Sequence, residues 1–401
     1  MVGDFPRTVE EISTEWLSGA LGGPVTGFEM TKLEGGLFAE TLRLHSISYA
    51  GEAGDLPPSV VIKMAHPDAD QRAMALGNNA YLKELRFFED LAPDVPLRSP
   101  GLYASASDGS PQAEFFILVM EDLSVHSKVF NQVDDTPSAD FALKQALELA
   151  EFHAQYWESS EVTLPWLGQP DGRYQFVLDS LARLAAGEWD SIRAAWKQMC
   201  RRDLFEGPDD QPLEELIARL CGPQCEAIID AISDLLSSRP LTVLHGDLRV
   251  DNLFRTDPAL GKGAEESALT YIDWQLIHAG PPGVEFTVAW MGSLEPEVRR
   301  LDLEMLRQYH ARLVELEPAA AAYTYEMLVE DYALSCCVYW LAVLGAVPTI
   351  AGGLDESGDQ RTRDLFHIAG IRSKAALREL NCAALIEQIC AGLPEGGSVA
   401  G

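Results

Sequence analysis

Two carboxylates and an amide that are suited to phosphate chemistry follow two short apolar segments in the middle of the chain. In "VLHGDLRVDN", Asp247 follows an apolar stretch, and Asn252 comes after four intervening residues. In "YIDW", Asp273 ends a second apolar stretch. One carboxylate of such a set can position and deprotonate an attacking hydroxyl, while an amide oxygen and another carboxylate hold Mg²⁺ against phosphates. The ordered set predicts metal-assisted phosphoryl transfer.

Two other interpretations account for parts of this pattern. A single Asp or Asn after a strand is often only a helix cap or a turn residue, but this does not explain the whole ordered set. A metal-dependent hydrolase using His245 and the aspartates would normally assemble several histidine ligands. The remaining histidines fall in no such cluster, which argues against the hydrolase.

The first part of the chain, residues 1–122, reads as mostly strands. "FEMTKLEGGLFAETLRLHSISYA" predicts two strands around a turn at Gly35 and Gly36, and Ser59–Ala65 predicts a third. "NNAYLKELRFFEDLA" has helical spacing of its apolar residues. "AEFFILVMEDL" predicts a buried strand that ends in the acidic pair Glu121 and Asp122.

After this point the sequence pattern indicates helices. "DFALKQALELAEFHAQYW", most of 172–238 and most of 296–392 have helical spacing, interrupted by the short strands in "LTVLHGD" and "ALTYIDW". We therefore predict an α+β chain with a small β-rich lobe over 1–122 and a large, mostly helical lobe over 123–401.

The segments "HGDLRVDN" and "IDW" resemble the catalytic and metal-binding segments of the aminoglycoside phosphotransferase and choline kinase superfamily, which has a bilobal protein-kinase-like fold. "FILVMEDL" and "EFHAQYW" look most like its ecdysteroid kinase-like and related bacterial members. The resemblance implies transfer of the γ-phosphate of ATP (or GTP) to a hydroxyl of a small molecule. It implies Asp247 as catalytic base, Asn252 and Asp273 as Mg²⁺ ligands, and His245 as a brace of the loop.

Lys63 in "VVIK" matches the strand lysine that pairs with nucleotide phosphates in this superfamily. Glu84 fits the helix glutamate that holds this lysine, with Glu89 as a competitor and a solvated helix face as a third possibility. A nucleotide-binding pseudokinase without turnover is the alternative function. Retention of the lysine, the base and both metal ligands argues against it.

The remaining nucleotide contacts are assigned by the same resemblance. Gly35 and Gly36 match a phosphate-covering turn, although a Gly-Gly hairpin by itself is a weak signal. Residues from Met120 to Leu123, including Glu121, match the hinge that meets the adenine through backbone groups.

Three features concern the acceptor. Gly246 stands where protein kinases usually have Arg, and only eleven residues separate Asp273 from Glu285, too few for a long activation loop. Glu285 itself replaces the Asp usual in this superfamily, so the carboxylate is retained on a side chain one methylene longer. His153 lies on an apolar helix stripe and is expected to be a core residue. We expect a small neutral or cationic alcohol as acceptor; the sequence does not identify it.

Composition limits the partners. With 30 basic and 62 acidic residues the net charge is −32, which disfavours nucleic acid and anionic membranes. The seven cysteines fit no disulfide framework, so we expect reduced thiols in a cytoplasmic protein. The uncharged run Tyr332–Leu354 is long enough to span a bilayer, but its Pro348 and Gly pair favour a buried helix. The sequence does not indicate an oligomeric state.

Overall fold

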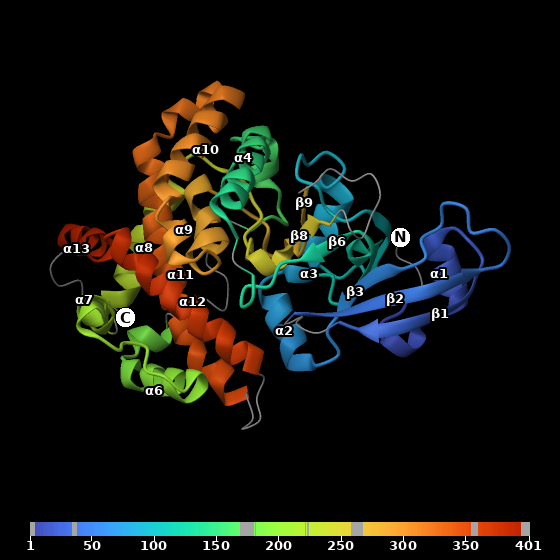
Figure 1. The fold of residues 1–401 in the computed structure, drawn as a ribbon, viewed down its shortest axis with the longest axis horizontal. Helices are drawn as coiled ribbons and strands as arrows, with labels where there is room; N and C mark the ends of the chain where they lie inside the picture. Colours follow the sequence, from blue (N-terminus) through green and yellow to red (C-terminus); the bar gives the residue numbers. More distant parts are fainter. Residues whose placement is uncertain are drawn as a thin grey trace. The chain divides into compact units, whose positions relative to one another are not determined.

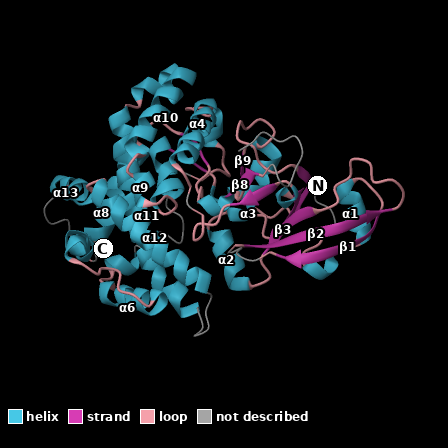
Figure 2. Cartoon of the chain, viewed as in Figure 1, coloured by secondary structure: helices cyan, strands magenta, loops and turns pink. Residues whose placement is uncertain are grey.

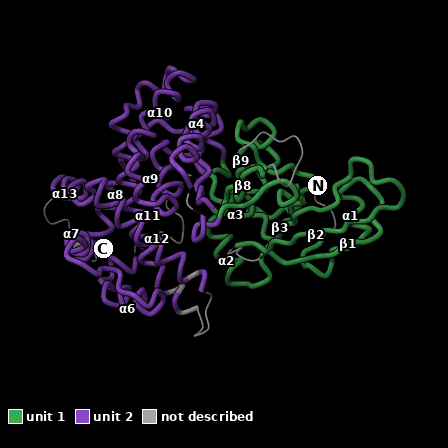
Figure 3. The backbone as a smooth tube through the Cα atoms, viewed as in Figure 1, with its two compact units in different colours: residues 1–130, 165–167, 251–277 green, residues 131–164, 168–250, 278–401 purple. Residues whose placement is uncertain are grey.

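The computed structural model describes residues 5–33, 38–135, 137–168, 180, 182–220, 222, 224–257, 268–353 and 360–393. The chain forms two compact units, shown in different colours in Figure 3. Unit 1 contains residues 1–130, 165–167 and 251–277, and unit 2 contains residues 131–164, 168–250 and 278–401.

Unit 1 is built on a five-stranded antiparallel sheet with the strand order β1-β2-β3-β5-β4. Figure 2 labels β1, β2 and β3 of this sheet and colours the strands magenta. Its strands are β1 (Val25–Lys32), β2 (Ala39–Tyr49), β3 (Val60–Ala65), β4 (Leu102–Ser107) and β5 (Phe116–Glu121). Three helices accompany the sheet: α1 (Thr14–Leu21), α2 (Ala69–Gly77) and α3 (Ala80–Arg86). The predicted strands around 28–49 and 59–65 correspond to β1, β2 and β3.

β3 is the central strand of this sheet, with β2 on one side and β5 on the other. Its sequence is nearly continuously apolar because both faces are covered, and Val60 and Ile62 are fully buried. Leu17 and Leu21 of α1 belong to the same core cluster. Burying one such side chain stabilises a fold by roughly 1.5–3 kcal/mol, so the strand that carries Lys63 is firmly held.

A second, three-stranded sheet in unit 1 has the order β6-β8-β9. It joins β6 (Ser127–Val129) to β8 (Leu253–Thr256) and β9 (Leu269–Tyr271). Because of these long-range pairs, residues 251–277 belong to the same compact unit as the amino-terminal sheet. The division by contacts thus differs from the division at residue 122 that the sequence pattern indicates.

Unit 2 is mostly helical (Figure 1). Its described helices are α4 (Ala139–Gln155), α6 (Trp189–Cys200), α7 (Gln211–Leu220), α8 (Gln224–Ser237), α9 (Pro296–Arg299), α10 (Asp302–Leu316), α11 (Tyr325–Gly353), α12 (Gln360–Glu379) and α13 (Cys382–Gly392). A two-stranded sheet pairs β7 (Thr242–Leu244) with β10 (His278–Gly280). The predicted α+β class, β-rich first and mostly helical afterwards, is confirmed.

Large aromatic side chains fill the core of unit 2. The ring of Phe286 lies with its centroid 4.5 Å from that of Trp290 and 4.8 Å from that of Tyr309, and all three side chains are fully buried. Such pairs add about 0.5–1.5 kcal/mol to the burial of their surface. This core lies directly after the segment that contains Glu285.

Among the described residues, one helix is long and apolar enough to cross a membrane, α11 over Tyr325–Pro348. In the most apolar stretch of this helix, 67% of the residues are buried inside the protein. The hydroxyl of Ser335 in this helix has an internal partner, because it accepts a 2.9 Å hydrogen bond from Thr287. A buried core helix has these properties.

Candidate active site

Lys63 of β3 lies between two carboxylates in unit 1. Its Nζ is 2.6 Å from Oε2 of Glu84 and donates a 2.7 Å hydrogen bond to Oδ1 of Asp273. Glu89, the competing partner, instead accepts a hydrogen bond from Ser105 Oγ at 2.8 Å. Of the two glutamates suggested by the sequence, the one paired with Lys63 is therefore Glu84.

The three charges strongly affect one another because Lys63 and Glu84 are buried and Asp273 is half-buried. Burial would lower the pKa of Lys63, but Asp273 and Glu84 outweigh it and raise that pKa above its usual value. Burial raises the pKa of Glu84 to about 7, with Lys63 opposing the rise and Asp273 adding to it. A cation between two carboxylates keeps this group of side chains near electrical balance.

Asn252 and Asp273 occupy neighbouring ends of two paired strands. β8 begins directly after Asn252, and β9 ends two residues before Asp273, with Leu253 opposite Tyr271. The N–H of Ile272 donates a 3.0 Å hydrogen bond to the carbonyl of Asn252. Antiparallel pairing therefore brings the backbones of the two predicted metal ligands together.

Asp273 has an uncommon backbone conformation, with φ 68° and ψ 60°. Asp adopts this left-handed region more readily than most residues, and such conformations cluster at functional sites. The next residue, Trp274, stacks on Phe87 with ring centroids 3.8 Å apart and an interplanar angle of 9°. Because Phe87 directly follows α3, this stack fixes Asp273 relative to the helix that carries Glu84.

Gln275 is a member of the group that the sequence reasoning did not single out. Its Nε2 donates a 3.1 Å hydrogen bond to Oδ2 of Asp273, and its Oε1 lies 3.5 Å from Nζ of Lys63. Both carboxylate oxygens of Asp273 therefore have a partner within unit 1. Only the position of Gln275, two residues after Asp273, could have drawn attention to it.

The oxygen donors of Asn252 and Asp273 fit Mg²⁺, which prefers carboxylate and carbonyl ligands and keeps several waters. In the described part of the chain, no three or more His, Cys, Asp and Glu side chains come together as a ready-made metal cage. A site completed by substrate phosphates does not need such a cage.

The other predicted nucleotide contacts lie on β5 or outside the described residues. Glu121 ends β5; its N–H donates to the carbonyl of Gly101, and its Oε2 accepts from the N–H of Gly101 at 3.1 Å. Leu123 is buried in a 3-10 turn after that strand. Gly35 and Gly36 lie outside the described residues, so their role stays a prediction.

In unit 2, Glu285 holds the loop that carries Asp247. It is fully buried, and its carboxylate accepts a 2.6 Å hydrogen bond from the N–H of His245 and a 3.1 Å hydrogen bond from that of Gly246. Gly246 has φ 83°, a conformation that favours glycine over the Arg of protein kinases. The longer side chain in place of Asp thus still reaches the loop.

The side chain of Asp247 lies at the edge of this held loop and is 14% exposed. Its N–H donates a 3.3 Å hydrogen bond to Nδ1 of His245, which supports the predicted bracing role of that histidine. Arg249 Nε donates a 3.3 Å hydrogen bond to Oδ1 of Asp247. Arg249 was not among the predicted site residues, and its position two residues after the base is the signal that would have indicated it.

His153 connects Glu285 to the core of unit 2. It is fully buried, as expected, and its Nδ1 lies 2.7 Å from the hydroxyl of Tyr309. Its Nε2 is 3.7 Å from Oε2 of Glu285, which is beyond hydrogen-bond length. Burial would raise the pKa of Glu285, but His153, His245 and the backbone donor of Gly246 lower it overall. The loop is therefore held by a charged carboxylate.

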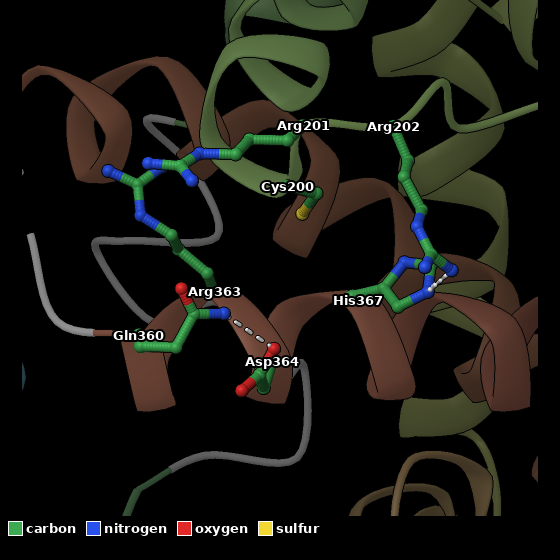
Figure 4. A pocket seen from close by; sticks show the side chains of 7 residues that line it. All are labelled: Cys200, Arg201, Arg202, Gln360, Arg363, Asp364 and His367. Carbon is green, nitrogen blue, oxygen red and sulfur yellow. Dashed lines mark hydrogen bonds between the residues drawn. The ribbon is translucent and has the colours of Figure 1, made fainter.

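Unit 2 also contains a cavity of about 180 Å³ between the end of α6 and the start of α12 (Figure 4). Its lining residues are Cys200, Arg201, Arg202, Gln360, Arg363, Asp364 and His367. Arg202 and His367 share a 2.9 Å hydrogen bond. None of the predicted site residues lines this cavity.

Solved structures with a similar fold include three kinases. A microcompartment-associated aminopropanol kinase is 15% identical, with 93% of this chain and 99% of that chain covered and a TM-score of 0.48. A putative fructosamine-3-kinase from Thermobifida fusca is 16% identical, with coverage of 92% and 100% and a TM-score of 0.44. The choline kinase LicA from Streptococcus pneumoniae is 13% identical, with coverage of 92% and 97% and a TM-score of 0.44. All three are named as kinases of small molecules. At these identities the likeness concerns the fold alone.

A family model also matches part of the chain. DUF1679, described as "Uncharacterized oxidoreductase dhs-27", matches residues 210–369, the stretch that contains Asp247, Asn252, Asp273 and Glu285. The name of this family refers to an oxidoreductase, and the match covers less than half of the chain. No curated protein matches the chain.

Proposed function

We propose that this protein is a Mg²⁺-dependent kinase that transfers the γ-phosphate of ATP (or GTP) to a hydroxyl of a small molecule. The observation that carries the proposal is the buried Lys63 between Glu84 and Asp273. A lysine fixed by a helix carboxylate and placed beside a metal-binding aspartate is the arrangement that orients nucleotide phosphates in kinases. An ordinary structural ion pair does not explain why the backbone of Asn252 is paired beside Asp273, through the hydrogen bond from Ile272.

In the proposed reaction, the oxygen of the acceptor hydroxyl attacks the γ-phosphorus while Asp247 accepts the proton of that hydroxyl. A new oxygen–phosphorus bond forms, and the bond from the γ-phosphorus to the bridging oxygen breaks. The electron pair stays on that oxygen, so the nucleoside diphosphate leaves and a phosphomonoester remains. Arg249, beside Asp247, is available to stabilise charge on the transferred group.

Asn252 and Asp273 would hold Mg²⁺, which when bound neutralises charge on the phosphates. Lys63 would bind phosphate oxygens, and Glu84 would keep Lys63 in place. Five peptide steps join Asp247 to Asn252, so their Cα atoms lie within roughly 18 Å of each other whatever the placement of the two units.

The acceptor and the location in the cell belong to the same proposal. We propose a small hydroxylated acceptor and a cytoplasmic protein, which is consistent with the acidic composition and free cysteines. A structure of the choline kinase LicA in complex with AMP is also similar in fold to this chain.

A nucleotide-consumption screen tests the proposal. The protein is incubated with ATP or GTP, Mg²⁺ and a panel of sterols, macrolides, aminoglycosides and amino-alcohols, with mass detection of the phosphorylated product. A phosphorylated small molecule that disappears with EDTA and with Asp247→Asn supports a kinase. Tight Mg²⁺-nucleotide binding without any product across the panel favours the pseudokinase.

A further inference from the structure

Two helices of unit 2 form the walls of the 180 Å³ cavity that lies between the end of α6 and the start of α12. The helices are in direct contact, because a Cβ added to Gly370 of α12 would lie 2.6 Å from Cζ2 of Trp196 in α6. Arg363 of α12 joins them as well: its side chain is buried and donates a 2.6 Å hydrogen bond to the carbonyl of Met199. The walls of the cavity are therefore held relative to each other.

The charges that line this cavity are mostly positive. They belong to three arginines and one aspartate, namely Arg201, Arg202, Arg363 and Asp364. Burial and the charge of Arg202 lower the pKa of His367, so its ring is neutral near pH 7. Burial also raises the pKa of the Cys200 thiol to about 11, so the thiol is neutral as well. The lining thus has an excess of positive charge in a chain whose net charge is −32.

Two of these arginines have donors that no protein group occupies. Arg201 has no hydrogen-bond or ion-pair partner among the residues that the structure describes. Arg202 donates a 2.9 Å hydrogen bond to Nε2 of the neutral His367, not to a carboxylate, and a guanidinium has five N–H donors. In contrast, Arg312 on the surface of the same unit pairs with two glutamates. The guanidinium groups of Arg201 and Arg202 are therefore available to an anion that is not part of the chain.

The arrangement of the arginines favours a tetrahedral anion. Figure 4 shows the side chains of Arg201 and Arg363 extending towards one another on one side of Cys200. Arg202 lies with His367 on the other side. Donors on two sides match the oxygens of a phosphate, which point in different directions, whereas the two oxygens of a carboxylate are satisfied by a single guanidinium fork.

The size of the cavity limits the ligand. Pockets for drug-sized molecules have volumes of roughly 300–1,000 Å³, so this cavity is too small for a nucleotide. It is several times larger than the share of roughly 30 Å³ that one water molecule takes in the liquid. A phosphate group with a few further atoms is the size of anion that it can hold.

We propose that this cavity binds a small phosphate, either inorganic phosphate or a phosphomonoester with few carbon atoms. Arg201 and Arg202 donate hydrogen bonds to its oxygens from two sides, and the buried Arg363 adds its positive charge. The cavity shares no residue with the candidate active site, so this binding site goes beyond the proposed kinase function and does not depend on it.

Calorimetric titration with inorganic phosphate, glycerol 3-phosphate and acetate tests the site at constant ionic strength, without Mg²⁺ and nucleotide. We expect at least one of the two phosphates to bind about tenfold or more tightly than acetate, because a single guanidinium fork satisfies a carboxylate. The tighter of the two shows whether the site takes free phosphate or an ester. Lys63→Met should retain this binding, which separates it from phosphate bound beside Lys63.

Two variants probe the named side chains. Arg201→Gln and Arg202→Gln each remove one exposed guanidinium and should weaken phosphate binding about tenfold or more. Lys197→Gln is the matched control, because it removes a positive charge from α6 at a side chain that does not line the cavity. Melting temperatures show whether each variant is folded. Phosphate should raise the melting temperature of wild type and of Lys197→Gln more than that of either arginine variant.

The proposal is wrong if the arginines only stabilise the carboxyl end of α6. In that case both arginine variants bind phosphate as wild type does, and any loss of melting temperature is the same with and without phosphate. Absence of phosphate binding to the unaltered protein, its loss in Lys63→Met, or equally tight binding of acetate would also overturn the proposal. The kinase function fails separately, if Mg²⁺-nucleotide neither binds nor is consumed while phosphate still binds in an Arg201-dependent way.

Discussion

The two units use carboxylates in opposite ways. In unit 1, Glu84 and Asp273 face the side chain of Lys63, and the charges balance one another. In unit 2, the buried Glu285 faces backbone N–H groups of His245 and Gly246. The first arrangement keeps charged side chains ready for a ligand, whereas the second fixes a loop so that Asp247 is held in place.

Under the proposed function, this difference would separate nucleotide binding in unit 1 from catalysis in unit 2. Changes in unit 1 should alter nucleotide and metal affinity, because its side chains would contact those ligands. Changes in unit 2 should alter turnover with little effect on nucleotide binding, because in the proposed reaction Asp247 deprotonates the acceptor and Glu285 holds the loop of Asp247. Each of the following variants tests one side of this contrast.

The largest effect is expected from Asp273→Ala. The change removes a hard oxygen ligand and one of the two partners of Lys63, so phosphate transfer should be abolished and the Mg²⁺ dependence of nucleotide binding lost. Transfer assays and calorimetry at several Mg²⁺ concentrations measure both. Asp90→Ala, which removes an aspartate that pairs with Arg86 at 2.8 Å on the surface, serves as control. Wild-type Mg²⁺ dependence in Asp273→Ala would contradict the metal assignment.

Asp247→Asn should reduce turnover by roughly two to four orders of magnitude, the usual contribution of a positioned base. Nucleotide affinity should be unchanged, because the change lies in unit 2. Steady-state rates with the acceptor and nucleotide titrations separate the two quantities. Asp203→Asn removes a carboxylate that pairs with Arg193 in the same unit and should keep full activity. Near wild-type turnover in Asp247→Asn rules out this base.

Glu285→Gln should have a smaller effect. One amide oxygen replaces two carboxylate oxygens, so one of the backbone N–H groups of His245 and Gly246 loses its acceptor. An unsatisfied buried donor costs about 1–3 kcal/mol, which corresponds to roughly a 10- to 100-fold loss of turnover at unchanged nucleotide affinity. Steady-state kinetics and nucleotide titrations measure this loss for Glu285→Gln, for Glu285→Asp and for the surface control Glu151→Gln. Equal losses in nucleotide affinity and turnover would show that the two units do not divide the work in this way.

The smallest effect concerns the pH dependence of stability. Because the pKa of Glu84 is about 7 instead of its ordinary 4.5, the folded protein binds more protons than the unfolded one between these values. The free energy of unfolding therefore contains a part that decreases as the pH rises through this window. Glu84→Gln should remove it, so the variant gains stability relative to wild type between about pH 5 and about pH 8. Urea unfolding of wild type and Glu84→Gln at about pH 5 and about pH 8 measures this gain in the free energy of unfolding. A difference between the two proteins that is the same at both pH values would contradict the raised pKa of Glu84.

The local sequence pattern was sufficient to predict many of the helices and strands. The apolar run of β3 and the helical stripe of α4 are determined by neighbouring residues, so their periodicity indicated them. The spacing of Asp247, Asn252 and Asp273 likewise indicated a site before any geometry was known. These features depend on short segments, which is why the sequence alone predicts them.

Long-range contacts could not be predicted from the local sequence pattern. The choice between Glu84 and Glu89 depends on a π-helical turn over Phe87–Leu91 and on where Ser105 lies. The pairing of β6 with β8 brings together segments more than a hundred residues apart. Sequence periodicity contains no information about such distances.

Transfer of labelled γ-phosphate tests the central claim most directly. Wild type and Asp247→Asn are incubated with labelled ATP, Mg²⁺, the small-molecule panel and generic protein substrates, and the label is traced by chromatography and mass spectrometry. We predict label on a hydroxyl of a small molecule with wild type and almost none with Asp247→Asn, while both proteins bind Mg²⁺-ATP equally. Label on protein substrates alone, or equal transfer by both proteins, would contradict the account.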